Sequence, residues 1–184
     1  MQAALLVIDM QMEMTFRTQS GRERANPDAE SNVAALLALF RAQGRPVIHV
    51  HHDEPGTAVA LDAPGGAVMP CAAPLPGETI LIKSRSSAFH GTGLDAHLRS
   101  QNISHLVIAG AVAAFCVTST TRAASDLGYM VLLPDDALIG FDLPRPDGSR
   151  ISAADLIDVT VTLLGADFAQ ALHTDAISSA LPPL

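Results

Sequence analysis

The stretch HLVIAGAVAAFCVTSTTRAASDLGYMVLLPDDA, residues 105–137, contains a complete strand–helix–strand pattern. Residues 105–110 form a short continuous apolar run, which is typical of a strand buried on both faces of a sheet. From about Cys116 to Leu127 the apolar residues have helical spacing, and residues 129–137 form the next strand and its exit. This pattern predicts two parallel strands joined by a helix.

The same alternation continues in both directions from this stretch. Residues 53–78 are rich in Gly and Pro and show little periodicity, so we expect a long loop there, and loops of this length are often functional. Alternating strands and helices favour an α/β fold in which helices cover both faces of a parallel sheet. The further predicted strands are residues 3–9, 45–52, 78–83 and 168–174, and the further predicted helices are residues 28–43, 93–101 and 151–166.

Length and composition restrict the class of protein. The 184 residues predict a single domain, residues 1–184. Hydrophobic residues make up 48% of the chain and charged residues only 16%, and the mean hydropathy is +0.29. Such an apolar composition favours a surface partly buried between subunits, so we expect a homodimer or homotetramer. The net charge of −8 and the lack of a basic patch argue against a nucleic-acid partner.

The chain shows no sign of membrane insertion or export. No apolar run approaches the roughly 20 residues that span a bilayer. The amino-terminal segment MQAALLVIDM lacks a basic region and reaches an acidic residue at Asp9, so it does not read as a signal peptide. We therefore predict a cytoplasmic protein without a membrane partner, in which Cys71 and Cys116 are free thiols.

Residues with chemical potential follow several predicted strands. Asp9 ends the first strand, Lys83 ends the third, and Cys116 follows the fourth. Each has a simpler interpretation: the Asp as a turn cap, the Lys as a solvated residue and the Cys as a small core residue. Because ligands of open α/β sheets bind beyond the carboxyl ends of the strands, the three together indicate a site.

The position of Cys116 indicates a nucleophile. A thiol at a helix N-terminus beside an ammonium group is expected to have a pKa lowered from about 8.5 toward 7 or below. A carboxylate beside it accepts the thiol proton and later returns it to a leaving amine. The Cys116 N–H, in the first turn of the helix, is a candidate donor to an oxyanion.

The sequence resembles the isochorismatase-like cysteine hydrolase superfamily. The resemblance rests on four blocks in order, and it departs from the usual pattern at Ala113, where Thr is common, and at residues 12–14. It implies a three-layer α/β fold with a six-stranded parallel β-sheet flanked by helices on both faces. The blocks are ALLVIDMQ (4–11), ILIKSRSSAFHGTGLDAHL (80–98), LVIAGAVAAFCVTSTTRAASDLGYMVLLPDDAL (106–138) and GADFAQALHTDAI (165–177).

The resemblance also implies the residues of the site. Asp9, Lys83 and Cys116 match its catalytic triad. A cis peptide bond is expected between Ala111 and Val112, which turns the Val112 N–H toward the oxyanion beside that of Cys116. The expected substrate-pocket residues are Gln11, Phe16, His52, Phe89, His90 and Phe115.

The run HVHHD, residues 49–53, invites a metal interpretation, because the nicotinamidase branch of the superfamily binds a metal through an Asp and several His at this place. Here the His spacing of that branch is absent. On a strand, His49 and His51 share one face while His52 faces the other. We therefore predict no metal and no other cofactor.

The leading functional hypothesis is a hydrolase that cleaves a small amide or related C–N bond through a thioester on Cys116. One alternative is vinyl-ether hydrolysis of an isochorismate-like small molecule, which needs an acid and no thiol. A second alternative is a non-catalytic scaffold that retains the triad residues. The sequence does not identify the substrate.

Overall fold

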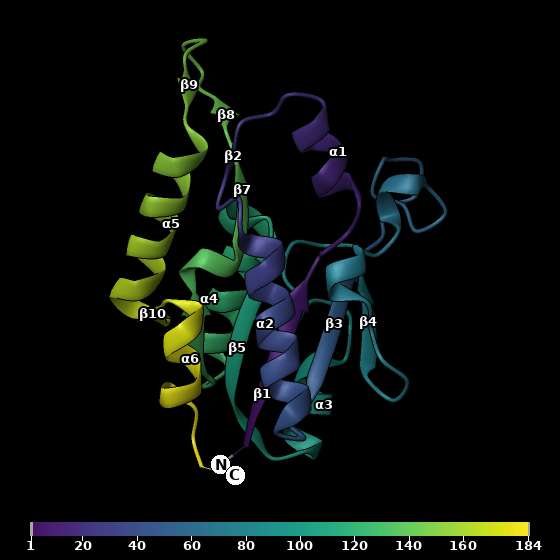
Figure 1. The fold of residues 1–184 in the computed structure, drawn as a ribbon, viewed down its shortest axis with the longest axis vertical. Coiled ribbons are helices and arrows are strands. Elements are labelled where there is room, and N and C mark those ends of the chain that lie inside the picture. Colours follow the sequence, from purple (N-terminus) through teal and green to yellow (C-terminus); the bar gives the residue numbers. More distant parts are fainter. Residues whose placement is uncertain (1, 184) are drawn as a thin grey trace.

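A six-stranded parallel sheet forms the centre of the computed structural model, which describes residues 2–183 (Figure 1). Its strand order is β10-β6-β5-β1-β3-β4, and every neighbouring pair in this order is parallel. The predicted α/β fold and the six predicted strands are therefore confirmed. The strands are β1 (Gln2–Ile8), β3 (Val47–His52), β4 (Thr79–Lys83), β5 (Ile103–Ala111), β6 (Met130–Pro134) and β10 (Gln170–Leu172).

The central strand β1 separates two hydrophobic cores. Its residues 2–8 alternate between them because successive strand side chains point to opposite faces. Leu5 and Val7 belong to one core, and Leu6 and Ile8 to the other; all are at most 2% exposed. This double burial explains why the strand reads as a continuous apolar run.

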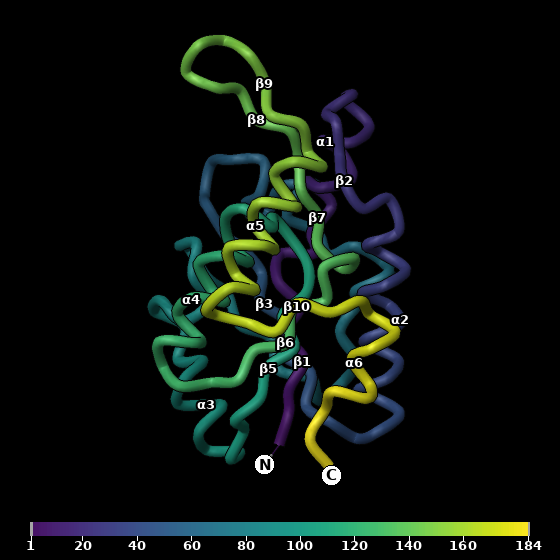
Figure 2. Tube along the Cα trace, turned by 90° about the vertical axis from the view of Figure 1, so that its left-hand side faces the viewer, coloured from purple at the N-terminus to yellow at the C-terminus, as the bar shows by residue number. Residues whose placement is uncertain are grey.

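Helices cover both faces of the sheet, as predicted, and the three layers are visible in Figure 2. One face packs against α2 and α6, and the other against α3, α4 and α5. In α2, Val33, Leu36, Leu37 and Phe40 supply the buried face, at the helical spacing that the sequence shows. The helices are α2 (Ala29–Ala42), α3 (Leu94–Ser100), α4 (Thr118–Asp126), α5 (Ala153–Asp167) and α6 (Thr174–Ala180).

Several elements were not predicted. Helix α1 (Glu13–Gln19) buries only Met14, so it lacks the apolar stripe that reveals a helix in a sequence. The other strands are two to four residues long, which is too short for a visible period. β2 (Arg24–Ala25) and β7 (Leu138–Phe141) pair antiparallel, and they extend the main sheet because β7 also pairs parallel with β5. β8 (Leu143–Pro144) and β9 (Arg150–Ile151) form a separate hairpin.

The long loop, residues 53–78, folds back against the segment that follows β1. The Met69 N–H donates to Met10 O at 2.9 Å, and the Met12 N–H donates to Ala67 O at 2.8 Å. Two short 3₁₀ turns, Pro64–Gly66 and Pro70–Ala72, give the loop local structure. The loop therefore has a defined path beside the carboxyl end of β1.

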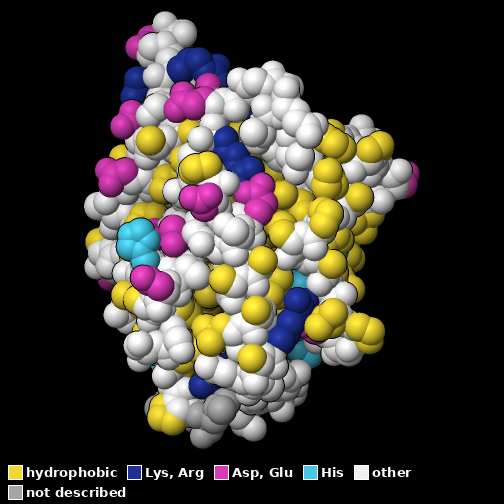
Figure 3. Space-filling model, viewed as in Figure 1, with side chains coloured by type: hydrophobic (Ala, Val, Ile, Leu, Met, Phe, Trp, Pro, Cys, Tyr) yellow, Lys and Arg dark blue, Asp and Glu magenta, His cyan; other side chains and the backbone are white. Residues whose placement is uncertain are grey.

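Apolar side chains gather over the loop and the edge strand β4, on the right of Figure 3. Leu61, Leu75, Ile80 and Ile82 are 41–50% exposed. The predicted homo-oligomer stays a prediction, and this apolar surface is a candidate contact for it. Among residues 2–183, no helix has both the length and the apolar character needed to cross a bilayer.

Candidate active site

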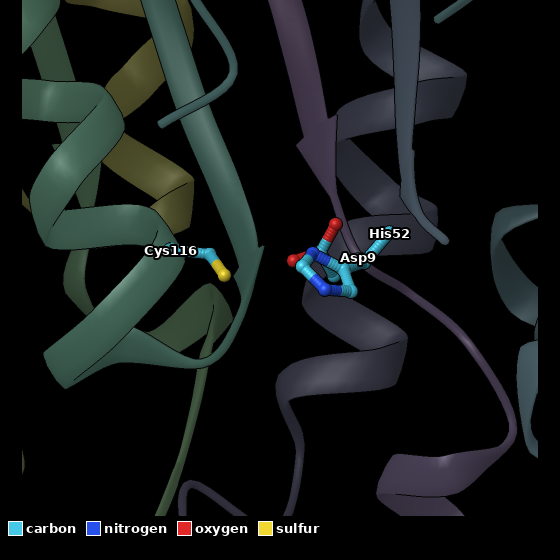
Figure 4. A group of neighbouring side chains, drawn as sticks. All are labelled: Asp9, His52 and Cys116. Atoms are coloured by element: carbon cyan, nitrogen blue, oxygen red, sulfur yellow. The ribbon is translucent and has the colours of Figure 1, made fainter. Parts of the chain in front are cut away.

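The three residues predicted as a triad meet beyond the carboxyl ends of the strands. The Lys83 Nζ lies 2.7 Å from Asp9 Oδ2 and donates to Cys116 Sγ at 3.2 Å. Asp9 follows β1, Lys83 ends β4, and Cys116 follows β5. Figure 4 shows the Cys116 sulfur pointing toward the Asp9 carboxylate from the opposite side of the site. The structure therefore brings an acid, an amine and a thiol into direct contact.

Asp9 is held at the end of β1 by the backbone. Its N–H donates to Val50 O of the neighbouring strand at 2.8 Å, and its φ of 48° turns the chain sharply away from the strand direction. Its side chain is thereby buried at the edge of the sheet, and the residue is 4% exposed.

Gly110 allows β5 to approach β1 at the same edge. Its φ is +118°, and a Cβ atom there would lie 2.1 Å from Ile8 O. Only glycine tolerates both this conformation and this contact. The approach brings the segment that carries Cys116 next to the segment that carries Asp9, and the peptide bond between Ala111 and Val112 is cis, at the position that the resemblance implies.

Cys116 lies in a π-helical turn, Ala113–Val117, and not at the start of the α-helix as the sequence predicted. The Val112 carbonyl accepts from the Phe115 N–H at 2.9 Å and from the Val117 N–H at 3.3 Å. Helix α4 begins only at Thr118. Single π turns of this kind occur frequently at functional sites.

The expected low thiol pKa is wrong. Burial and the Asp9 charge raise the pKa of Cys116 to about 11, and the neighbouring Lys83 ammonium only partly opposes this. Burial outweighs the Lys83 ammonium at Asp9 too, and the pKa of that carboxyl is raised. At neutral pH the resting thiol keeps its proton, and the more basic carboxylate is better able to take that proton during attack.

One oxygen of the carboxylate has room for that proton. Asp9 Oδ1 is buried and has no hydrogen-bond partner in the part of the chain that the structure describes, whereas Oδ2 contacts Lys83. An unpaired buried carboxylate oxygen is energetically costly, and a proton donor beside it removes that cost. The arrangement suits transfer of a proton between a substrate group or the thiol and Asp9.

His52 joins the site through a contact that sequence reasoning missed. Its Nδ1 lies 2.9 Å from Lys83 Nζ, and the two residues are direct partners in the β3–β4 register. Both are the last residues of their strands, and this shared position is the signal that would have revealed the pair. The structure therefore places His52 beside the triad, as the pocket prediction requires.

Gln11 does not fit its predicted role as a pocket residue. It is 1% exposed, and its side-chain amide accepts from the His52 N–H at 2.8 Å and donates to His52 O at 2.9 Å and Gly66 O at 3.0 Å. Both amide hydrogens are thereby used by the backbone, so none remains for a substrate. Gln11 instead fixes the end of β3 to the segment after β1 and to the loop.

The other predicted pocket residues differ in their surroundings. Phe16 and Phe115 are 37% and 49% exposed, so both offer apolar surface to a ligand. Phe89 stacks on Tyr129 with ring centroids 5.9 Å apart and packs against the second core. His90 is exposed, and no side-chain hydrogen bond joins it to the site within residues 2–183.

The residues near the site do not fit the metal centre of the nicotinamidase branch. His49 and His51 point to the opposite face of the sheet from His52, where His49 contacts Glu78 at 2.9 Å. Asp9, His52 and Cys116 do place ligand-type atoms within 4.8 Å of one another. All three, however, already bond to Lys83, so the ammonium fills the space where a metal ion would bind.

A large cavity of the molecule lies elsewhere. It has a volume of about 730 Å³ and is open toward solvent at the amino ends of β1 and β5, near Gln2, Ile103 and Pro183. Within residues 2–183, the side chains that line it include no cysteine and no carboxylate. The reactive residues, rather than cavity size, therefore locate the candidate active site.

Comparison with known proteins identifies the family of the chain. The Isochorismatase domain model matches residues 3–176. The chain belongs to the isochorismatase family. A solved structure of this family, a putative hydrolase from Chromobacterium violaceum, superposes with a TM-score of 0.91 at 36% identity and covers 97% of this chain and 93% of its own.

Two curated relatives of the chain are named as hydrolases. Streptothricin hydrolase of Streptomyces noursei is 33% identical over 98% of this chain and 66% of its own length. Ureidoacrylate amidohydrolase RutB of Cronobacter sakazakii is 45% identical over 64 residues, which is 35% of this chain and 28% of its own. The chain is thus an isochorismatase-family protein similar to hydrolases, amidohydrolases included.

Proposed function

We propose that this isochorismatase-family protein is a cysteine hydrolase that cleaves a small amide or related C–N bond through a thioester on Cys116. The observation that carries the proposal is the bridging position of Lys83, whose Nζ contacts both Asp9 Oδ2 and Cys116 Sγ. A nucleophile, a base and a cation that supports both anions are the components of covalent acyl transfer. The proposed chemistry uses no cofactor.

In the acylation step, Cys116 Sγ attacks the carbonyl carbon while the thiol proton moves to Asp9. The electron pair of the carbonyl π bond moves to oxygen and forms a tetrahedral oxyanion. Asp9 then gives the proton to the nitrogen, the C–N bond breaks, and ammonia or an amine leaves. The raised pKa of Asp9 favours the first of these transfers, because a stronger base accepts the thiol proton more readily.

In the deacylation step, a water molecule replaces the amine. Asp9 takes a proton from that water, the resulting hydroxide attacks the thioester carbon, and the C–S bond breaks. The proton returns from Asp9 to Cys116, and a carboxylic acid leaves. Throughout the cycle the Lys83 ammonium stabilises whichever of its two neighbours carries the negative charge.

The backbone after β5 is the proposed oxyanion site. The N–H groups of Val112 and Cys116 are the candidate donors, and a buried backbone donor of this kind accelerates acyl transfer by about 10²–10³-fold. Phe115, exposed next to the nucleophile, and Phe16 are the proposed apolar walls for the rest of the substrate.

The relatives support the reaction class but not a substrate. Streptothricin hydrolase matches nearly the whole chain, and RutB matches about a third of it. Their names cover hydrolysis and amidohydrolysis, which is the chemistry that an Asp–Lys–Cys arrangement performs. A panel of small primary amides, ureido and carbamoyl compounds is therefore the appropriate first screen.

The test is ammonia or amine release from that panel by the full chain, with the Cys116→Ala and Cys71→Ala variants beside it. We expect Cys116→Ala to lose activity by at least about 10³-fold and Cys71→Ala to keep it. Mass spectrometry of rapidly quenched protein should show the acyl group on the peptide that contains Cys116. Full amidase activity in Cys116→Ala would refute the mechanism.

Vinyl-ether hydrolysis is the second candidate, and one observation favours it. The raised pKa of Asp9 makes the carboxyl a potential acid for protonating a vinyl carbon. That reaction predicts pyruvate release from an isochorismate-like substrate at a rate that Cys116→Ala does not change. Absence of turnover with both substrate classes, together with retained ligand binding, would favour the scaffold interpretation.

A further inference from the structure

Lys83 contacts a third residue, His52, in addition to its two triad partners Asp9 and Cys116. Its Nζ lies 2.7 Å from Asp9 Oδ2, 2.9 Å from His52 Nδ1 and 3.2 Å from Cys116 Sγ. Its side chain is 0% exposed, so water does not compete for these donors. An ammonium group has three hydrogens and no lone pair, and here each hydrogen has one acceptor.

We propose that His52 is a positioning residue that holds the Lys83 ammonium between Asp9 and Cys116. The Asp9 carboxylate attracts the ammonium more strongly than the neutral thiol does. A third acceptor opposes a tilt of the ammonium toward Asp9 alone. The loss of that acceptor would leave a buried N–H without a partner, which costs free energy and frees Nζ to move away from Sγ.

The ring of His52 is oriented for this role. Because Lys83 can only donate, His52 Nδ1 must accept, and the ring hydrogen of the neutral imidazole is then on Nε2. Nε2 faces Glu54, whose Oε2 lies 3.6 Å away, and the Glu54 side chain is 62% exposed. The charged groups that face His52 are therefore Lys83 and Asp9 on one side and Glu54 on the other.

The backbone of His52 is fixed as well. Gln11 bonds to both the N–H and the carbonyl of His52, and the β3–β4 register sets His52 directly beside Lys83. Neighbouring side chains in a register pair lie on the same face of the sheet. Few conformations are therefore available to the ring, which is the condition for one side chain to position another.

His52→Leu and His52→Asn separate positioning from other roles. Leucine keeps the apolar volume and removes both nitrogens. Asparagine places an amide oxygen near the position of Nδ1, so it retains an acceptor for Lys83 while it removes Nε2. His51→Leu, on the opposite face of the same strand, is the matched control for damage to β3, because burial holds the pKa of His51 at about 4 and the ring is neutral.

The first measurement is the rate of Cys116 alkylation by iodoacetamide in the folded chain at pH 8, read by peptide mass spectrometry with Cys71 as internal standard. Because the pKa of Cys116 is about 11, the rate at this pH is proportional to the thiolate fraction. We expect His52→Leu to slow alkylation by about tenfold, since Nζ no longer supports the thiolate. His52→Asn should recover most of that rate, and His51→Leu should show no loss. Equal rates in wild type and His52→Leu overturn the inference.

The second measurement rests on the proposed function, because it uses an amide substrate. We expect His52→Leu to lower kcat by about tenfold with little change in KM, and His52→Asn to recover most of kcat. An increase in KM alone, with unchanged alkylation, would make His52 a substrate contact and overturn the positioning role. If the chain hydrolyses no amide, the proposed function fails. The effect of His52→Leu on Cys116 alkylation would still support the inference in that case.

Discussion

Two polar clusters lie at opposite ends of strands β3 and β4, and their differences distinguish a structural cluster from a reactive one. The structural cluster lies at the amino end of β4 and consists of Arg41, His49 and Glu78. The reactive cluster lies at the carboxyl end and contains Asp9, His52, Lys83 and Cys116. Each contains a carboxylate, a cation and a histidine from β3.

The two carboxylates differ in how fully they are bonded. Glu78 accepts from Arg41 through both oxygens, at 2.7 and 2.9 Å, and also from His49 Nε2 and the Leu75 N–H. Asp9 contacts one cation through Oδ2, and Oδ1 has no partner within residues 2–183. Bonding from several donors lowers the pKa of Glu78 to about 2, whereas burial raises the pKa of Asp9.

The difference between the two carboxylates shows how hydrogen bonding at a reactive site differs from that at a structural one. A carboxylate with many donors is held as an anion and stabilises the fold. A buried carboxylate with a free oxygen beside a thiol is poised to take a proton. Charged residues lie at strand ends in both clusters. The two clusters are distinguished by the number of hydrogen bonds that each carboxylate accepts.

The largest expected effect comes from Asp9→Asn. Amide hydrolysis should fall by about 10³-fold, because the general base and acid is removed. Alkylation of Cys116 should respond in the opposite sense and become about tenfold faster at pH 8, because the Asp9 charge no longer raises the thiol pKa. The rate of reaction with iodoacetamide, with Cys71 as standard, measures this, and a slower reaction would contradict the assigned electrostatics.

Lys83→Met should change the same alkylation rate in the other direction. Without the ammonium, the Cys116 thiolate loses its nearest cation, so alkylation at pH 8 slows by about tenfold. The variant also frees the oxygen, nitrogen and sulfur atoms that Lys83 holds, a donor set that suits cobalt or zinc. We expect a sulfur-to-cobalt charge-transfer band on titration of Lys83→Met with Co²⁺, absent in the wild type and in the Lys83→Met/Cys116→Ala double variant.

Glu78→Gln should affect stability and leave the reaction intact. The amide keeps the shape but removes the charge that binds Arg41, so we expect a loss on the order of 2 kcal/mol in the free energy of unfolding. Urea denaturation measures this loss. Amide hydrolysis and Cys116 alkylation should stay within about twofold of wild type, because the two clusters have no shared partner.

The pH dependence of stability tests whether the ionised Glu78 carboxylate stabilises the fold. The pKa of Glu78 falls from an ordinary 4.5 to about 2 in the folded state. Its stabilisation is therefore present above about pH 4.5 and is lost as the pH falls toward 2, where the folded carboxylate becomes protonated. Urea midpoints of the wild type and Glu78→Gln should converge over this range, and a constant difference would exclude Glu78 as the titrating group.

The smallest expected effect comes from Arg41→Lys. Lysine keeps the charge but cannot contact both oxygens of Glu78 at once, so we expect a loss of about 1 kcal/mol without a change in activity. Thermal and urea unfolding at several salt concentrations measure it. A loss as large as that of Glu78→Gln would mean that the paired geometry, and not the charge, stabilises this end of the sheet.

The strand pattern of the sequence predicts the sheet well and the reactive cluster only in part. Mostly apolar runs locate the six strands of the central path, because strand residues that pack into a core are mostly apolar. The same runs place Asp9 and Lys83 at strand ends. The contact between His52 and Lys83 depends on the register of β3 against β4, which no single strand encodes.

The thiol shows the limit of local reasoning most directly. The order of strand and helix suggests a cysteine activated by a helix N-terminus. The structure instead sets Cys116 in a π turn, buried beside a carboxylate, and its pKa is raised to about 11. Burial and neighbouring charge depend on segments far apart in the chain, so the sign of the shift could not be inferred from the local sequence.

By itself the sequence determined the α/β class, the six parallel strands and the candidates Asp9, Lys83 and Cys116, because apolar periodicity and strand ends are local properties. Only the tertiary structure decided which polar side chains meet. It set His52 as the third acceptor of Lys83, used Gln11 to fix the backbone of His52 and, within residues 2–183, left one oxygen of Asp9 without a hydrogen-bond partner. Those relationships arise from strand register and close packing, which depend on the whole fold.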